Sequence, residues 1–399
     1  MPASFHVRMQ GRSIDESHRA STPFELLFDL VFVVAVASVV TQLAHAIIAG
    51  RLGEGIGPFL MVFFAIWWAW MNFTWFSSGY DTDDVLYRLL GFVQMAGVVV
   101  IAASVPAAFE GADYRPIAVG YLIMRLGLVA LWVRAAIEHP QTRAVSSRYA
   151  IGIVVAQGLW LLRLLLPVEW LTVSFVVFAL VELSVPVWAN RAGRDPWHPG
   201  HIAERYGLFV IILLGEGVLA ATSGVQSALA ASGVSPALIA VGIAGLAMLF
   251  GLWWVYFLQP SAEGLRRRRG LSFYWGYGHY LLFAAIAAVG AGLEVAVQAA
   301  GHPGKVPDAV AGWAVAVPLA VVLVLIWVLH RPLVERSEVP AVVVLPAAAL
   351  MLCAPLAAPL LGLVGVAVLL IVLLAVVIAV TMLMGPDTRR GADEASRLA

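Results

Sequence analysis

Apolar residues run through this chain in long blocks separated by short polar stretches. Each block approaches or exceeds the roughly 20 residues that an α-helix needs to cross a hydrocarbon core of about 30 Å. The blocks therefore predict twelve membrane-spanning helices, at residues 22–48, 57–78, 85–105, 116–136, 148–167, 170–189, 202–223, 235–258, 273–297, 308–329, 339–360 and 363–384.

The last two spans are separated on grounds of length. Residues 339–384 contain no charged side chain, and one straight helix of that length would be about twice as long as the core is thick. A turn near Leu361 and Gly362 resolves the conflict. Composition supports the same class of protein, because 62% of the residues are hydrophobic, 12% are charged and the mean hydropathy is +0.92.

Basic residues mark one side of the predicted membrane. Lysine and arginine concentrate in cytoplasmic loops, and of the 24 basic residues only Arg51, Arg115 and Lys305 fall in loops on the opposite side. This bias predicts that both termini are cytoplasmic. The run Arg266–Arg269 follows the same rule, and no wider basic surface predicts nucleic-acid binding. The lipid bilayer is therefore the expected partner.

Polar and aromatic residues recur along the chain at a nearly constant offset. The offset from Asp29 to Glu216 almost equals the offset from the pair Trp67–Trp68 to the pair Trp253–Trp254. This recurrence predicts an all-α protein of two parallel six-helix repeats, an arrangement in which sites often form between the repeats. The predicted segments are a cytoplasmic N-terminal segment (1–20), the first repeat (21–190), the second repeat (191–384) and a cytoplasmic C-terminal tail (385–399).

Three acids inside predicted spans are the main candidates for function. Glu25 and Asp29 lie one helical turn apart on one face of the first span, and Glu216 lies in the seventh. Intramembrane carboxylates are costly, so they are expected to face a path, a partner or water. As functional groups they would bind a cation or carry protons. As structural groups they would be ion-paired, and Glu25 is the accessory member because it has no counterpart in the second repeat.

The seventh span opens with His201, Glu204 and Arg205. A histidine and a glutamate three residues apart can share a metal ion, but a site needs more ligands than these two. Glu204 is better explained as an acid that complements a helix N-terminus. Arg205 is expected to pair with the acids of the first or seventh span and to control their charge.

Further polar residues within spans are secondary candidates. Arg125, Arg163 and Glu182 are expected to pair among themselves, or Arg163 to extend to the membrane surface; an anion site is the alternative. His279 is expected to be a hydrogen-bonded core histidine, with titration as the alternative. Asn72 is expected to bond across helices or to line a path, together with Trp67, Trp68, Trp253 and Trp254.

The motifs themselves resemble a known family. The segment Phe24–Val33, which reads Phe-Glu-Leu-Leu-Phe-Asp-Leu-Val-Phe-Val, and the motif His201-Ile-Ala-Glu-Arg205 followed by Leu214-Gly-Glu216 are similar to the low-temperature-requirement A family of bacterial membrane proteins. The resemblance implies a bacterial cytoplasmic membrane protein linked to growth in the cold. Phe28-Asp29 after an arginine is also similar to two-repeat potassium channels with Arg…Phe-Ser-Asp, although this chain lacks the serine.

These observations lead to one expected function and two alternatives. The expected function is a channel or secondary transporter for a small ion or solute. The first alternative is a non-transporting structural or regulatory protein that supports growth in the cold, and the second is a membrane-embedded enzyme acting on lipid-linked substrates. No phosphate loop, His-Glu-x-x-His or Gly-x-Ser-x-Gly motif is present, so neither an enzyme nor a cofactor is expected. The sequence leaves a homo-oligomer open.

Overall fold

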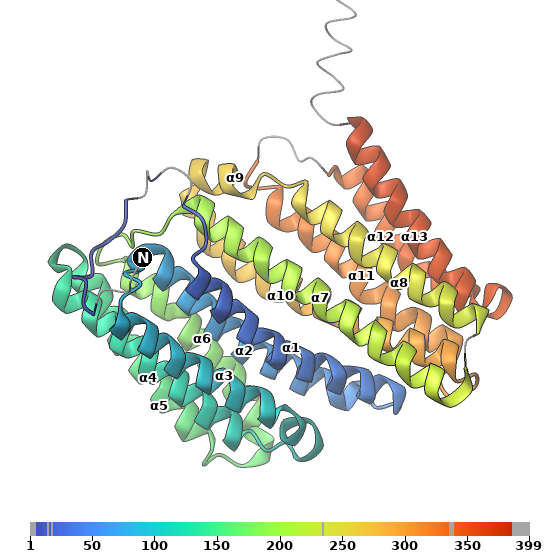
Figure 1. Cartoon of the computed structure of the whole chain (residues 1–399), viewed down its shortest axis with the longest axis horizontal. Coiled ribbons are helices and arrows are strands. Elements are labelled where there is room, and N and C mark those ends of the chain that lie inside the picture. Colours follow the sequence, from blue (N-terminus) through green and yellow to red (C-terminus); the bar gives the residue numbers. More distant parts are fainter. Residues whose placement is uncertain (1–4, 14–15, 17–18, 234, 335–338, 385–399) are drawn as a thin grey trace, which may run out of the picture. The chain divides into compact units, whose positions relative to one another are not determined.

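The structure, a computed structural model, describes residues 5–13, 16, 19–233, 235–334 and 339–384. Every regular element among them is helical (Figure 1). The α-helices are α1 (Pro23–Ile48), α2 (Leu52–Tyr80), α3 (Val85–Gly111), α4 (Arg115–Glu138), α5 (Arg143–Arg163), α6 (Leu171–Asn190), α7 (Pro199–Ser232), α8 (Pro236–Phe257), α9 (Ser261–Arg267), α10 (Ser272–Gly301), α11 (Asp308–His330), α12 (Ala341–Cys353) and α13 (Ala358–Met384). The predicted C-terminal tail, 385–399, lies outside the described residues.

Eleven helical stretches in the described chain are long and apolar enough to cross a membrane. The prediction of a polytopic α-helical membrane protein is therefore confirmed. The last stretch, Ala341–Met384, has 44 residues and contains both of the last two predicted spans. It is broken by the 3₁₀ turn Ala354–Ala357 and by Gly362, whose φ of 64° and ψ of −180° are not helical. The expected turn near Gly362 is thus present, and glycine suits it because it lacks a Cβ.

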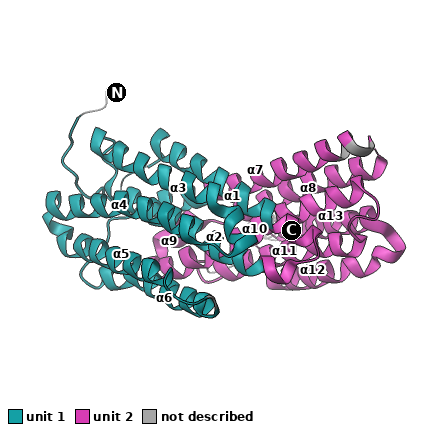
Figure 2. Cartoon of the chain, turned by 90° about the horizontal axis from the view of Figure 1, so that it is seen from below, with its two compact units in different colours: residues 1–42, 56–206 teal, residues 43–55, 207–399 magenta. Residues whose placement is uncertain are grey.

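The chain divides into two compact units (Figure 2). Unit 1 comprises residues 1–42 and 56–206, and unit 2 comprises residues 43–55 and 207–399. In unit 1, α3 packs on α4, α4 on α5, and α5 on α6. In unit 2, α10 packs on α8 and α11, while α13 packs on α8, α11 and α12. The predicted repeat boundaries and the repeat itself stay predictions.

Small residues allow helices to approach closely within each unit. A Cβ placed on Gly97 of α3 would lie 2.5 Å from the carbonyl oxygen of Gly120 in α4. In unit 2, a Cβ on Gly292 of α10 would lie 2.1 Å from the carbonyl oxygen of Ala314 in α11. Membrane helices pack through such small residues because lipid provides no hydrophobic drive for their association. The third and fourth helices of each predicted repeat therefore pair in the same manner.

The helices place apolar side chains outward and many charged side chains inward. Leu126 on α4 is 61% exposed, whereas its neighbour Arg125 is buried. This is the pattern expected when lipid covers the outer surface, because a charge facing hydrocarbon is costly. The buried charges are therefore the main candidates for function.

Candidate functional site

The most extensive group of buried charges in unit 1 is centred on Arg205, near the start of α7. Its guanidinium is fully buried. It forms a bidentate ion pair with the carboxylate of Asp29 on α1. Arg205 Nη2 donates to Asp29 Oδ1 at 2.6 Å, and Nε donates to Oδ2 at 3.0 Å. Trp70 on α2 donates its indole N–H to Oδ1 at 2.7 Å. Paired fork contacts of this kind are among the strongest hydrogen bonds in proteins.

Glu25 belongs to the same group and also caps its own helix. Its backbone N–H donates to the Thr22 hydroxyl at 3.2 Å, and the Thr22 backbone N–H donates to Glu25 Oε2 at 2.8 Å. This reciprocal pair is a capping box, which satisfies two amides at the start of α1. The other carboxylate oxygen, Oε1, lies 3.2 Å from Arg205 Nη1. His201 Nε2 lies 3.1 Å from Oε2.

Arg19 adds a second buried cation from the segment before α1. It donates to the carbonyl oxygens of Ser77 at 2.9 Å and Ser78 at 2.5 Å, near the end of α2. A cation is favourable there because the helix C-terminus carries partial negative charge. Arg19 Nη2 also lies 3.6 Å from Glu25 Oε1 and 3.8 Å from Asp81 Oδ2.

Asp81, in the loop after α2, is the least well satisfied acid of this group. Its Oδ2 lies 3.8 Å from both Arg12 and Arg19, and its Oδ1 has no hydrogen-bond donor among the described residues. Burial, reinforced by the charge of Glu25, raises the pKa of Asp81 to about 6, against the opposing effect of the two arginines. Asp81 is therefore expected to lose its proton at a higher pH than an ordinary aspartate does.

We call Arg19, Glu25, Asp29, Asp81, His201 and Arg205 the Arg205 cluster. The ion pairs expected of Arg205 with the acids of the first span are present. Both oxygens of Asp29 are occupied, so a cation could bind there only after Arg205 moved. The predicted role of Asp29 in a path, and its approach to Glu216 of unit 2, stay predictions.

Glu216 in unit 2 has a different environment from Asp29. Its side chain is 4% exposed, and its Oε2 is buried without a hydrogen-bond donor among the described residues. The charge of Glu294 on α10, which is itself 9% exposed, acts on Glu216. The two helices touch here, since a Cβ on Gly217 would lie 3.6 Å from the Cα of Gly290. Two buried acids thus lie on helices that are in contact, and no ion pair reaches either among the residues that the structure describes.

The predicted aromatic residues fall into two groups. Trp67 and Trp68 on α2 are buried, whereas Trp253 and Trp254 on α8 are 46% and 47% exposed. The amide of Asn72 donates to the carbonyl of Trp68 one turn earlier in α2, at 2.7 Å, and no bond from Asn72 to another helix is found among the described residues. The predicted role of these side chains in lining a path stays a prediction.

The secondary charged candidates separate into one ion pair and one isolated arginine. Arg125 on α4 pairs with Glu182 on α6 at 2.5 Å. Tyr121 and Trp160 also donate to this carboxylate, at 2.9 and 2.6 Å. Arg163 joins neither the pair nor the surface, since it is 3% exposed and no described carboxylate lies within ion-pair distance.

The histidines and Glu204 contact protein groups. His279 is buried, with Nδ1 2.7 Å from the Trp275 carbonyl and Nε2 3.2 Å from the Tyr256 hydroxyl, as expected of a core histidine. Glu204 accepts the backbone N–H of Ser21 at 3.1 Å. Among the described residues, no group of three or more potential metal ligands is found.

Three acids with clear structural environments were missed by sequence reasoning. Asp81 and Asp84 lie in a short polar loop, where an acid normally meets water. Asp84 instead accepts two hydrogen bonds from Arg134, at 2.6 and 2.9 Å, and caps α3 by accepting the N–H of Tyr87 at 2.9 Å. Glu294 could have been found, because it is the single charged residue of the tenth helix, Ser272–Gly301.

These features define a polytopic α-helical membrane protein with buried ion pairs near the ends of its first helices. The chain belongs to the bacterial low-temperature-requirement A (LtrA) family, whose model matches residues 20–379. The family resemblance inferred from the motifs is thereby confirmed. The chain is also similar to an uncharacterized protein of Rhizobium meliloti (strain 1021), with 26% identity over 318 residues, which are 75% of this chain and 74% of that relative. No solved structure matches the chain.

Proposed function

We propose that this protein moves a small cation, in the first instance a proton, across the bacterial cytoplasmic membrane. In this proposal Glu216 and Glu294 of unit 2 are the carboxyl groups that bind the cation. The observation that carries the proposal is their burial on two touching helices without an ion pair to any described residue.

The chemistry follows from the energy of buried charge. Two buried carboxylates on touching helices are costly when no counter-charge accompanies them. A bound proton or small cation removes much of that cost. Intramembrane carboxyl groups of this kind are characteristic of proton relays and ion pathways. Glu216 and Glu294 therefore fit a binding step better than a purely structural role, for which a basic or hydrogen-bonding partner would be expected.

The Arg205 cluster has a separate part in this proposal. It joins the starts of α1 and α7 to the end of α2, and its acids are already paired with arginines. We assign it the role of holding these helix ends together on the cytoplasmic side, where the positive-inside bias also places both termini. Asp29 then contributes to the fold, and Glu216 with Glu294 to the cation site.

Ion flux into proteoliposomes tests the proposal. Purified protein is reconstituted, and uptake of H⁺, Na⁺ and K⁺ is compared for the wild type, Glu216→Gln, Glu294→Gln and the double variant. Wild type is expected to conduct at least one of these ions, and each single variant to lose most of that flux. Glu110→Gln, at an exposed position near the end of α3, is the matched control and should retain it. Flux that is unchanged in the double variant would remove these acids from the mechanism.

A structural or regulatory role is the second candidate function. It is favoured by Asp29, because both of its carboxylate oxygens already accept hydrogen bonds. An acid that is hydrogen-bonded to Arg205 and Trp70 links three helices, which suits a structural role better than ion transport. If wild-type protein of verified fold carries none of the three ions, while loss of the Arg205 cluster still abolishes growth in the cold, this second function replaces the first.

A further inference from the structure

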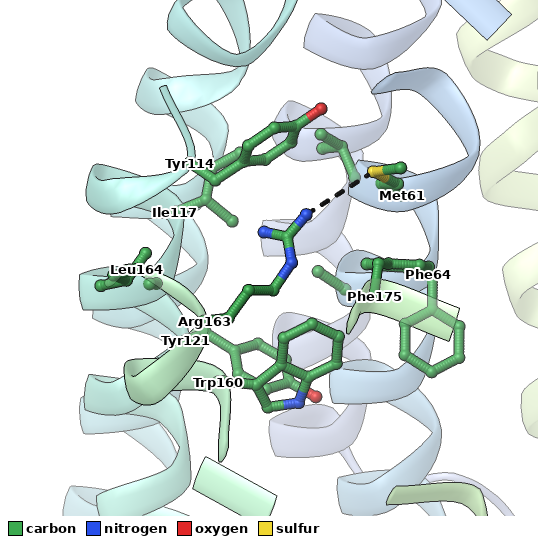
Figure 3. A pocket seen from close by; sticks show the side chains of 12 residues that line it. Met61, Phe64, Tyr114, Ile117, Tyr121, Trp160, Arg163, Leu164 and Phe175 are labelled. Carbon is green, nitrogen blue, oxygen red and sulfur yellow. Dashed lines mark hydrogen bonds between the residues drawn. The ribbon is translucent and has the colours of Figure 1, made fainter. Parts of the chain in front are cut away.

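A small cavity lies in unit 1, at the end of the helices where α4 and α6 begin and α5 ends (Figure 3). The space inside it that is open to the centres of water-sized molecules amounts to about 50 Å³. One water needs roughly 10–15 Å³ by this measure, so the cavity has room for a few waters or a small polyatomic group. Its walls are mainly apolar and aromatic, and include Met61, Tyr114, Ile117, Trp160 and Phe175.

The single charged side chain that lines this cavity is Arg163. Figure 3 shows its guanidinium between Tyr114 and Met61, with Trp160 below it. Its Nε and Nη2 both donate to the carbonyl oxygen of Leu171, at 3.3 and 2.9 Å, and Nη2 also lies 3.9 Å from the Met61 sulfur. The remaining nitrogen, Nη1, has no hydrogen-bond acceptor among the residues that the structure describes.

The surroundings of Arg163 compensate its charge only in part. The guanidinium carbon lies 5.0 Å from the ring centre of Tyr114 and 5.8 Å from that of Phe175. Such cation–π contacts are weakly favourable. They do not replace a counter-anion, because an unpaired charge at a buried position is far more costly than that.

A buried carboxylate beside the cavity, that of Glu182, is already occupied. Glu182 lies beyond the cavity wall, where Tyr121 and Trp160 donate to it and Arg125 forms its ion pair. Since Tyr121 and Trp160 also line the cavity, the wall separates a neutralised carboxylate from an arginine that lacks one. The packing of α4, α5 and α6 therefore gives Arg125 a carboxylate partner and leaves Arg163 without one among the described residues.

We propose that this cavity binds a small oxyanion, a carboxylate or a phosphate, that carries an apolar substituent. The guanidinium of Arg163 would receive the oxyanion through its free N–H groups, in the planar geometry that arginine offers to carboxylates and phosphates. The aromatic and aliphatic wall would accept the substituent. Because the cavity lies at the end of a predicted span, the ligand is either a soluble organic anion or the phosphate of an anionic lipid.

This proposal does not depend on cation transport, since it concerns other residues in the other unit. The test uses full-length protein in nanodiscs of phosphatidylcholine, which has no net charge, with radiolabelled benzoate and inorganic phosphate as probes in equilibrium dialysis. A second arm replaces the lipid with phosphatidylglycerol and counts retained phosphatidylglycerol by native mass spectrometry. Saturable binding of benzoate or phosphate identifies a soluble anion, and retention of phosphatidylglycerol alone identifies a lipid headgroup.

Three variants separate ligand binding from folding. Arg163→Gln removes the charge and should weaken binding by about tenfold or more, the range expected for a charge-assisted contact. Ala118→Leu keeps the charge but fills the cavity, and should also abolish binding. Arg115→Gln, exposed near the same end of α4, should bind like the wild type. The proposal is overturned if wild type binds no probe and retains no phosphatidylglycerol, or if both cavity variants bind as well as wild type.

Discussion

The contact between Arg205 and Asp29 is the clearest case in which one side chain fixes another. Both groups are buried, so each needs the other to offset its loss of water. The pair also connects α7 to α1, far apart in the sequence, and Trp70 extends the connection to α2. Removing a single partner leaves an uncompensated charge, and this predicts a large and strongly coupled effect on stability.

We expect Asp29→Asn or Arg205→Met to lower the free energy of unfolding by about 3–5 kcal/mol, the cost of breaking a buried ion pair from one side. The double variant Asp29→Asn/Arg205→Met should lose less than the sum, because neither charge of this pair is left without the other. Unfolding in detergent, followed by circular dichroism, measures all four proteins. Additive losses would show that the two groups do not act as a pair.

Asp81 gives a prediction that depends on pH. Its pKa is raised to about 6, mainly by burial, so between about pH 4 and 6 the folded protein binds more protons here than the unfolded chain. This group therefore lowers stability as pH rises through that window. Asp81→Asn, which has no charge to bury, should match wild type near pH 4 and exceed it by about 2 kcal/mol above pH 6. Thermal unfolding across this range measures the difference.

Asp84 should show the opposite dependence on pH. Burial acts to raise its pKa, but the hydrogen bonds from Arg134 and from the backbone N–H groups of Val7 and Tyr87 outweigh it and lower the pKa to about 2. The ionised form thus stabilises the fold above about pH 4, and this stabilisation is lost as the pH falls towards 2. Asp84→Asn should therefore be less stable than wild type at neutral pH, with a difference that narrows in acid. A constant difference at all pH values would contradict this.

The sequence predicted some of these side-chain environments and missed others for identifiable reasons. Arg205, Glu25 and Asp29 lie inside apolar blocks, where a charge needs a partner, so their pairing could be expected. Asp81 lies in a polar loop and gave no such signal, since only the folded chain shows that Arg12 and Arg19 cover it. The expected bond of Asn72 across helices is not found among the described residues, because an amide within a helix can also bond to the carbonyl one turn earlier.

Helix boundaries followed the hydropathy pattern only approximately. The second predicted span begins at residue 57, whereas α2 begins at Leu52. The seventh ends at residue 223, whereas α7 continues to Ser232. Hydropathy locates the part of a helix that lies in lipid, and polar turns that extend beyond it carry no apolar signal. The short helix α9, which contains Glu263 and Arg267, was missed for the same reason.

Close approach of α3 and α4 gives a prediction about helix packing. A methyl group at Gly97 would meet the backbone of Gly120 at 2.5 Å, so Gly97→Ala must separate the two helices and should lower the unfolding temperature markedly. Gly158→Ala in α5 is the matched control, because nothing lies within 4 Å of its Cβ position. It should be neutral or stabilising by up to about 1 kcal/mol, since alanine favours helix more than glycine does. Equal effects of the two variants would contradict the assigned packing.

The packing of the third and fourth helices agrees with the predicted two-repeat organisation. In each predicted repeat the third and fourth helices meet through small residues, at Gly97 and Gly120 in one and at Gly292 and Ala314 in the other. The candidate sites of the two repeats nevertheless differ. Asp29 is held by Arg205, whereas Glu216 has no ion pair among the described residues and its helix touches the helix of another buried acid, Glu294. If the chain arose by duplication, the two copies have since taken different roles, which the flux and unfolding experiments address separately.

The orientation of the chain in the membrane can be predicted and tested with single cysteines. The positive-inside bias places the loop between α1 and α2 outside the cytoplasm and the loop between α9 and α10 inside it. Gly53, in the first turn of α2, and Gly270, between α9 and α10, report on these two ends, because each is exposed and a side chain there would meet nothing within 4 Å. In a Cys353→Ser background, which removes the single native cysteine, Gly53→Cys should react with a membrane-impermeant maleimide in intact cells.

Gly270→Cys should react with the same reagent only after the inner membrane is permeabilised. The contrast follows from the cost of moving arginine across the bilayer, since the run Arg266–Arg269 directly precedes this position and would have to be translocated for the opposite orientation. Labelling of Gly270→Cys in intact cells, with Gly53→Cys protected, would reverse the orientation of unit 2. It would then place the ends of α7 and α10 nearest Glu216 and Glu294 on the cytoplasmic side, and the proposed cation would enter its site from the cytoplasm.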